Sequence, residues 1–163
     1  MKTIKDRVDN FFKWVKGSEL VELTDIDVSE DPVRPELDLE FRTSYDRKIY
    51  GLKYEDSIEG IICVAFMNEI PQTIRELDML SRLANNTGTI AVAYTVWSRK
   101  RGAGRQIIEK FLDFIKDQNQ ITQLITLSPL TPMATHFHIS NGAKLLQINS
   151  ETQNFEYQWR LIN

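Results

Sequence analysis

The sequence is poor in residues that cross-link chains or bind metals: its 163 residues include one cysteine and two histidines. A single cysteine, Cys63, excludes a disulfide framework within the chain and suits a reducing compartment. Because Cys63 sits in an apolar run, residues 61–66, we expect a buried structural thiol. The histidines, His136 and His138, have no cysteine or carboxylate partners at ligand spacing, so we predict no metal site.

Long apolar runs and an excess of positive charge are also missing. No run approaches the ~18 residues of a membrane span, and the first residues carry no signal-type apolar stretch. We therefore expect a cytoplasmic protein without a membrane partner. A net charge of −3 and a pI near 5.5 argue against a general nucleic-acid binder. The length fits one domain, residues 1–163, with neither a repeat nor a linker.

Apolar periodicity predicts the order of the elements. Helices are expected at 2–16, before Gly17, at 74–83 (or a packed loop there), from the loop after residue 98 to about 118, and at 133–141, before Gly142. Strands are expected at 48–54, 60–67, 89–97, 123–127 and 155–161. The acidic, Pro-punctuated residues 20–36 predict a loop or a short edge strand. The order indicates an α/β (α+β) domain with a mixed central sheet, helices on both faces, and 60–67 as a central strand.

A basic glycine loop follows the 89–97 strand and opens the next helix; it comprises Arg99, Lys100, Arg101, Gly102, Ala103, Gly104 and Arg105. Unpaired backbone N–H groups and the positive end of a helix favour an anion at such a position. Gly102 and Gly104 allow a phosphate to approach the backbone closely. A basic, solvated turn is the alternative interpretation.

Two further residues are candidates for chemistry: Ser128, at the end of an apolar run, and His138, just before Gly142. A hydroxyl can hydrogen-bond a carboxylate or an enolate, and an imidazole can donate or accept a proton near neutral pH. Ser128 equally fits a plain strand end, and His138 a helix residue bonded to backbone. The acidic residues Asp25, Asp27, Glu30 and Asp31 predict a solvated face, with recognition of a cationic acceptor as the alternative.

The Arg-x-x-Gly-x-Gly form of the basic loop resembles the pyrophosphate loop of the GCN5-related N-acetyltransferase (GNAT) superfamily, which binds coenzyme A. Ala134-x-x-Phe137-His138-x-x-x-Gly142-Ala143 is similar to a later helix of that superfamily, where a tyrosine commonly stands in place of His138. The resemblance implies a coenzyme A thioester, acetyl-CoA or malonyl-CoA, held by the loop together with Val96 and Trp97. It also implies that the central strands splay near 94–97 and 126–128 to form a slot.

One branch is more similar still: the C-terminal catalytic domain of malonyl-CoA decarboxylase. Its patterns resemble this chain at 62–71, 93–97, 126–129 and 137–143, including Leu-Ser-Pro and Phe-His-x-x-Asn-Gly-Ala. The resemblance implies that Ser128 and His138 form the catalytic pair. Residues 1–49 match nothing in that family, and only residues 129–137 stand where it has a long insertion.

These observations support three functions. The first is decarboxylation of a malonyl-type thioester through Ser128 and His138. The second is transfer of an acetyl group from acetyl-CoA to an amine. The third is a non-catalytic domain that binds an acyl-CoA or a protein. A homodimer is a further expectation.

Overall fold

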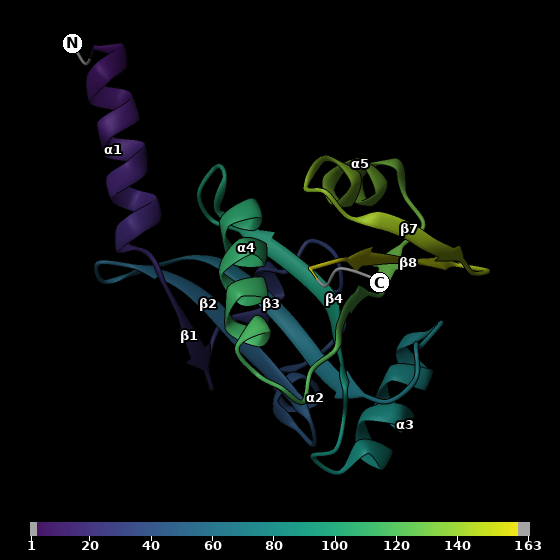
Figure 1. Ribbon diagram of the computed structural model, residues 1–163. Helices are drawn as coiled ribbons and strands as arrows, with labels where there is room; N and C mark the ends of the chain where they lie inside the picture. The colour runs from purple at the N-terminus through teal and green to yellow at the C-terminus, as the bar shows by residue number, and fades with distance from the viewer. Residues whose placement is uncertain (1–2, 160–163) are drawn as a thin grey trace.

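A computed structural model describes residues 3–159, which form one mixed sheet with helices on both faces (Figure 1). The strands are β1 (Glu19–Leu23), β2 (Arg47–Tyr54), β3 (Ser57–Met67), β4 (Ile90–Ser98), β5 (Gln123–Thr126), β6 (Ser128–Pro129), β7 (Lys144–Ile148) and β8 (Thr152–Tyr157). The helices are α1 (Ile4–Gly17), α2 (Leu39–Thr43), α3 (Ile74–Ala84), α4 (Ala103–Lys116) and α5 (Pro132–Ser140), with a 3-10 turn at Val28–Glu30.

The sheet runs in the order β1-β2-β3-β4-β5-β8-β6, and β7 pairs with β8. Neighbouring strands are antiparallel except β4 and β5, which are parallel. Two apolar cores form because successive side chains of a strand point to opposite faces. Ile62 packs with Phe111 of α4 on one face, and Ile61 packs with Leu77 of α3 on the other. This double burial makes β3 the central strand that its apolar run predicts.

Most expected elements are confirmed within a residue or two of their bounds. The acidic segment 20–36 begins with an edge strand, β1, and residues 74–83 form a helix rather than a loop. Three elements were not predicted: α2 and β7, which are only five residues each, and β6, which has two. The last strand lies at Thr152–Tyr157, earlier than the predicted 155–161, of which residues 160–161 lie outside the described part.

Strands β4 and β5 separate midway along the sheet, as expected. They pair from Ile90↔Gln123 to Ala93↔Thr126, and one more bond joins Leu127 N–H to the Ala93 carbonyl. Immediately afterwards β4 has a bulge, because its register with β3 shifts between Cys63 and Val64. A bulge bends a strand and increases its twist. Beyond it, β4 stays with β3 while the chain after β5 pairs with β8 as β6.

Candidate functional site

A cavity of about 630 Å³ opens where β4 and β5 separate. Its walls are the end of β4, the β5–β6 link, the start of α4, the inner side of α5 and the segment before α2. Among its lining residues are Val96, Trp97, Gly104, Ser128 and His138. The volume is within the range of about 300–1,000 Å³ that is usual for small-molecule sites. Five of the residues selected from the sequence therefore meet at one cavity.

Arg34 fills the gap in the backbone hydrogen bonding at the point of separation. Its Nε donates to the Tyr94 carbonyl at 2.9 Å, and its Nη2 donates to the Leu127 carbonyl at 3.0 Å. The first carbonyl belongs to β4 and the second to the link between β5 and β6, where the two strands have just parted. A buried carbonyl without a donor is costly, so the Arg34 guanidinium stabilises the open arrangement. Nothing in the sequence singled out Arg34, whose partners are backbone atoms 60 and 93 residues away.

A buried ion pair fixes the segment that carries Arg34. Asp31 and Arg42 contact each other at 2.7 Å, with both side chains fully buried. Asp31 also accepts from Thr95 Oγ1 at 2.9 Å and from the N–H groups of Val33 and Arg34. The prediction of a solvated acidic face is therefore wrong at Asp31, because a carboxylate so well supplied with donors can be buried. The segment is a rigid wall of the cavity rather than a surface loop.

Ser128 is a buried hydroxyl, 3% exposed, at the start of β6. Its Oγ donates to Thr126 Oγ1 at 2.8 Å, and Thr126 Oγ1 also accepts from the Phe155 N–H at 3.0 Å. Thr126 carries a proton of its own, so the two hydroxyls can exchange donor and acceptor roles. A turn of the Thr126 hydroxyl towards Ser128 frees the Ser128 proton for a ligand in the cavity.

His138 lies on the buried side of α5. Thr131 caps this helix by accepting from the Ala134 N–H, and Pro132 occupies the first turn, where no N–H is needed. His138 Nδ1 lies 2.7 Å from Tyr157 Oη, and the imidazole packs against the Phe155 ring at 5.2 Å. Burial lowers the pKa of His138 from 6.5 to about 4, so the ring is neutral at pH 7.

The hydrogen bond to Tyr157 also determines where the ring proton sits. Burial raises the pKa of Tyr157, so its hydroxyl stays protonated and needs an acceptor. His138 Nδ1 is the acceptor that the described residues provide. The proton of the neutral ring is then on Nε2, which makes His138 a hydrogen-bond donor. No hydrogen bond joins Ser128 and His138, which have different partners in the described chain.

The start of α4 presents free backbone donors close to the cavity. Gly102 caps the helix with φ +88° and without a side-chain hydrogen bond. In the described chain, the N–H groups of Gly104 and Arg105 donate to no protein acceptor. A Cβ on Gly104 would lie 3.1 Å from the Phe137 ring, so glycine allows α4 and α5 to approach closely. This geometry suits an anion, because the positive end of the helix adds to the free N–H groups.

The cations of the loop are more dispersed than expected. Arg99 forms two bonds of 2.9 Å with Glu30, a residue of the cavity wall. Arg105 pairs with Glu109 at 3.3 Å, and Lys100 Nζ lies over the Trp14 ring at 4.5 Å. Arg101 and Gly102 are exposed, whereas Ala103 is buried against the sheet and does not line the cavity. An incoming phosphate would therefore compete with existing partners at Arg99 and Arg105 but not at the free N–H groups.

Three residues that matter to the site were not proposed from the sequence, namely Arg34, Thr126 and Tyr157, and Asp31 was considered there only as part of an acidic face. Tyr157 falls within the predicted last strand, but nothing in the sequence pairs it with His138. Trp97 is buried beside Arg42, 5.6 Å from its guanidinium, and also lines the cavity.

Within residues 3–159, no group of three or more possible ligands could hold a metal ion. No helix of the described chain is long and apolar enough to cross a membrane.

No family model and no curated protein matches the sequence. Solved structures do match the fold. Malonyl-CoA decarboxylase from Cupriavidus metallidurans is 22% identical over 83% of this chain, with a TM-score of 0.54. The loading GNATL domain of CurA from Lyngbya majuscula is 15% identical over 86% of this chain and 96% of its own length, with a TM-score of 0.63. The GphF GNAT-like decarboxylase, solved with isobutyryl-CoA, is 14% identical over 73% of this chain and 82% of its own length, with a TM-score of 0.61.

The chain spans 37% of the length of the Cupriavidus malonyl-CoA decarboxylase. At these identities the comparisons establish architecture, and they confirm the predicted single GNAT-like domain with a mixed sheet between helices. The separated strands β4 and β5, the glycine loop before α4 and the helix α5 are its landmarks here. The chain thus has the fold of the GNAT superfamily and is similar in structure to malonyl-CoA decarboxylase.

Proposed function

We propose that this protein is an acyl-CoA enzyme that decarboxylates a malonyl-type thioester with Ser128 and His138. One observation carries the proposal: both side chains line the cavity between β4 and β5, where the start of α4 also lies. They come from two consecutive elements, β6 and α5, which present both side chains to the same cavity. The decarboxylases with the same fold support the reaction type.

The carrier end of the substrate would bind at the start of α4. The free N–H groups of Gly104 and Arg105 suit pyrophosphate oxygens, and the exposed Arg101 can add a charge-assisted contact. The acyl end then extends between β4 and β5, past Val96 and Trp97, towards Ser128 and His138. The GphF enzyme, solved with isobutyryl-CoA, supports an acyl-CoA in this fold.

Decarboxylation needs little covalent help from the protein. The bond between the carboxylate and the α-carbon breaks, CO₂ leaves, and the electron pair delocalises into the thioester as an enolate. One proton, taken ultimately from water, completes the acetyl thioester. The protein accelerates this step by removing solvation from the carboxylate and by donating hydrogen bonds to the enolate oxygen.

His138 has the properties of that donor. Its Nε2 carries the proton because Nδ1 accepts from Tyr157, and burial keeps the ring neutral. A neutral imidazole in a buried site donates a hydrogen bond without needing a counter-ion. A pKa of about 4 makes the same ring a weak general base at pH 7. This property favours decarboxylation over acetyl transfer in which His138 removes a proton from an amine.

Ser128 would orient the other end of the malonyl group. Its hydroxyl is held by Thr126, so it enters the reaction without loss of rotamer freedom. The turn of the Thr126 hydroxyl described above lets Ser128 donate to the substrate carboxylate. We therefore assign carboxylate positioning to Ser128 and enolate stabilisation to His138.

The test follows coenzyme A species by mass spectrometry in two reactions: malonyl-CoA alone, and acetyl-CoA with a panel of amines. The expected result is acetyl-CoA from malonyl-CoA without an acceptor, lost in His138→Ala and strongly reduced in Ser128→Ala. His136→Ala is the matched control, because His136 is exposed and lies two residues away on the same helix.

Other outcomes would replace the proposal. Free coenzyme A released only in the presence of amines would make the protein an N-acetyltransferase. Binding of both thioesters without turnover, unchanged by His138→Ala, would favour the non-catalytic alternative.

A further inference from the structure

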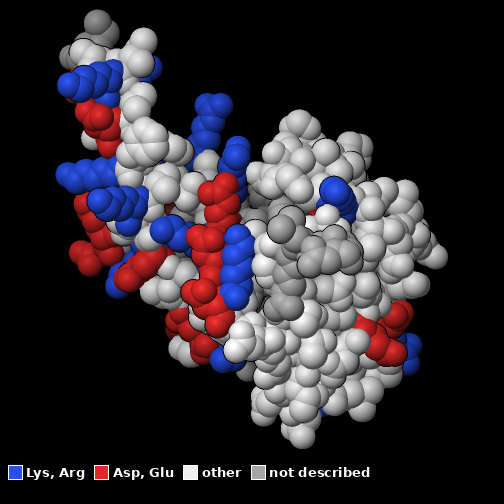
Figure 2. Space-filling model, in the orientation of Figure 1, with Lys and Arg blue, Asp and Glu red and all other residues white. Residues whose placement is uncertain are grey.

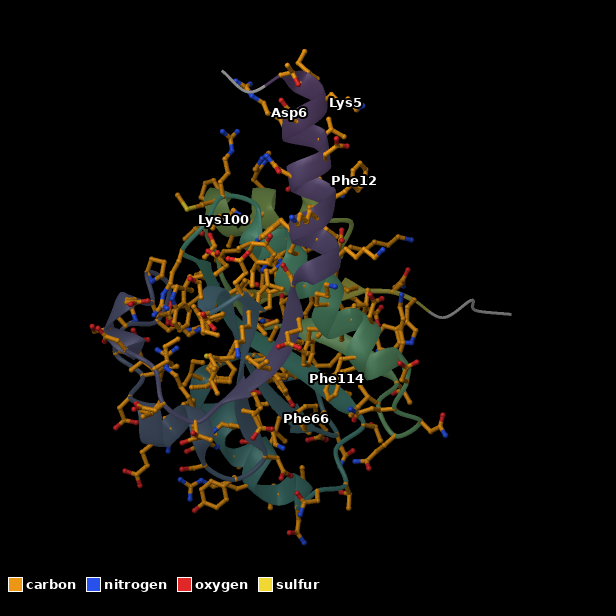
Figure 3. All side chains as sticks on the ribbon, turned by 90° about the vertical axis from the view of Figure 1, so that its left-hand side faces the viewer. Lys5, Asp6, Phe12, Phe66, Lys100 and Phe114 are labelled. Atoms are coloured by element: carbon orange, nitrogen blue, oxygen red, sulfur yellow. The ribbon has the colours of Figure 1, made fainter. Side chains whose placement is uncertain are left out.

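Helix α1 projects from the body of the molecule and leaves its apolar side uncovered (Figures 1 and 3). Ile4, Val8, Phe11 and Phe12 recur at helical spacing and so share one face. All four are exposed, Phe11 by 52% and Phe12 by 63%. Helices of about 12–15 residues are marginal in water without tertiary packing, so the projecting part of α1 needs a partner.

Only the last turn of α1 is fixed to its own body. Trp14 is 4% exposed and packs under Lys100, whose Nζ lies 4.5 Å from the Trp14 ring. Ser18 alone separates α1 from β1, and both its N–H and its Oγ donate to the Trp14 carbonyl. These contacts fix the direction of the helix relative to β1. The helix therefore cannot turn at Ser18 and fold its apolar face onto its own sheet without losing them.

The body has an unfilled groove beside α4, with a volume of about 410 Å³. Leu20, Tyr50, Phe66 and Phe114 supply its apolar lining. Phe114 is 38% exposed, and its ring lies 5.7 Å from that of Tyr50. Figure 3 shows Phe66 and Phe114 on the body, away from the projecting part of α1 that carries Phe12.

The charges of the two surfaces are complementary. Lys5 and Arg7 flank the apolar face of α1, one on each side, since each residue advances by about 100° around a helix of 3.6 residues per turn. Asp6 is on the opposite half, where it completes the capping box with Thr3. The groove has two carboxylates, Glu22 and Asp46, against the single ammonium of Lys48. Lys48 pairs with Glu22 at 3.1 Å, so the excess negative charge lies at Asp46, which accepts one hydrogen bond from the Asn86 N–H. Figure 2 shows basic and acidic side chains gathered over α1 and its neighbours, whereas few are visible over α5, β7 and β8.

We propose that α1 of one copy lies in the α4 groove of a second copy, and the reverse, so that the protein is a symmetric dimer. The exchange is reciprocal, so it closes at two copies rather than growing into a filament. It buries the apolar face of α1 against the aromatic side chains of the groove and brings Lys5 and Arg7 towards its carboxylates. This inference is independent of the proposed function, since neither surface contains a residue assigned to catalysis.

The first test is the mass in solution, by size-exclusion chromatography with light scattering. The wild type is expected at twice the chain mass of 19.0 kDa. Phe12→Glu on the helix and Phe114→Glu in the groove should each give the single-chain mass. Ile148→Glu is the matched control: Ile148 is also 63% exposed but lies on β7, and its variant should stay dimeric.

The second test identifies the two surfaces directly and needs only mild substitutions. Cys63 is buried, so engineered cysteines react alone. Phe12→Cys and Phe114→Cys proteins, mixed and oxidised, should form a disulfide between the two different chains. A single-chain mass for the wild type would overturn the proposal, as would loss of the dimer in Ile148→Glu alone. Cross-linking of Phe12→Cys to itself in place of the mixed product, or binding of monomers to anionic vesicles through α1, would also overturn it.

Discussion

Replacing Tyr157 by phenylalanine removes one oxygen atom from the site and tests the state assigned to His138. The lost bond is the 2.7 Å contact between Tyr157 Oη and His138 Nδ1, made where both residues are less than 8% exposed. The substitution leaves the imidazole nitrogen buried without a donor, which costs about 1–3 kcal/mol. We expect Tyr157→Phe to lower the free energy of unfolding by that amount in urea titrations.

The same variant should change the imidazole itself. The chain has only two histidines, so ¹⁵N NMR distinguishes His138 from the exposed His136. In the wild type, His138 should carry its proton on Nε2 at neutral pH and protonate only near pH 4, its pKa. In Tyr157→Phe the preference for Nε2 should weaken, and if the proposed decarboxylation is correct its rate should fall about tenfold, or 1.4 kcal/mol. A wild-type His138 that protonates near pH 6.5, or carries its proton on Nδ1, would refute the reasoning.

Three other predictions follow from buried groups. Burial lowers the pKa of His138 from 6.5 to about 4, so the unfolded chain binds the extra proton: stability should fall by about 3 kcal/mol as pH drops from 6.5 towards 4. Urea titrations across this range should show that His138→Gln removes this component and His136→Gln does not. Arg42→Met leaves the buried Asp31 carboxylate without its cationic partner and should lower the free energy of unfolding by about 3–5 kcal/mol. Adding Asp31→Asn should recover part of this loss, and an additive loss in the double variant would contradict the pairing. Arg34→Met removes two hydrogen bonds to buried carbonyls and should lower the free energy of unfolding by about 2–4 kcal/mol. An Arg34→Lys variant as stable as the wild type would argue against the role of Arg34 in binding both carbonyls.

The local order of the fold is encoded in short stretches of sequence. Regular apolar spacing identified α1 and α4 and indicated a helix or a packed loop at α3, and the continuous apolar run at 60–67 identified the central strand β3, because these patterns report burial directly. Glycine marked the start of α4 and the end of α5: Gly102 and Gly142 both have positive φ. The five-residue elements α2 and β7 were missed because tertiary packing stabilises them more than any pattern of their own. Their side-chain spacing spans too few turns or alternations to stand out.

By itself the sequence determined the class of domain, the position of the glycine loop and two residues, Ser128 and His138, that line one cavity. Only the tertiary structure decided the state of His138, because its partner is remote along the chain, whereas Ser128 bonds the nearby Thr126. Tyr157 sets the tautomer of His138 from 19 residues away, and Arg34 holds the separated strands from 60 and 93 residues away. Burial, which lowers the pKa of His138, is likewise a property of packing. The sequence shows which chemical groups are present. The burial of a group such as His138 and the hydrogen-bond partners from distant segments exist only once those segments meet in the folded chain.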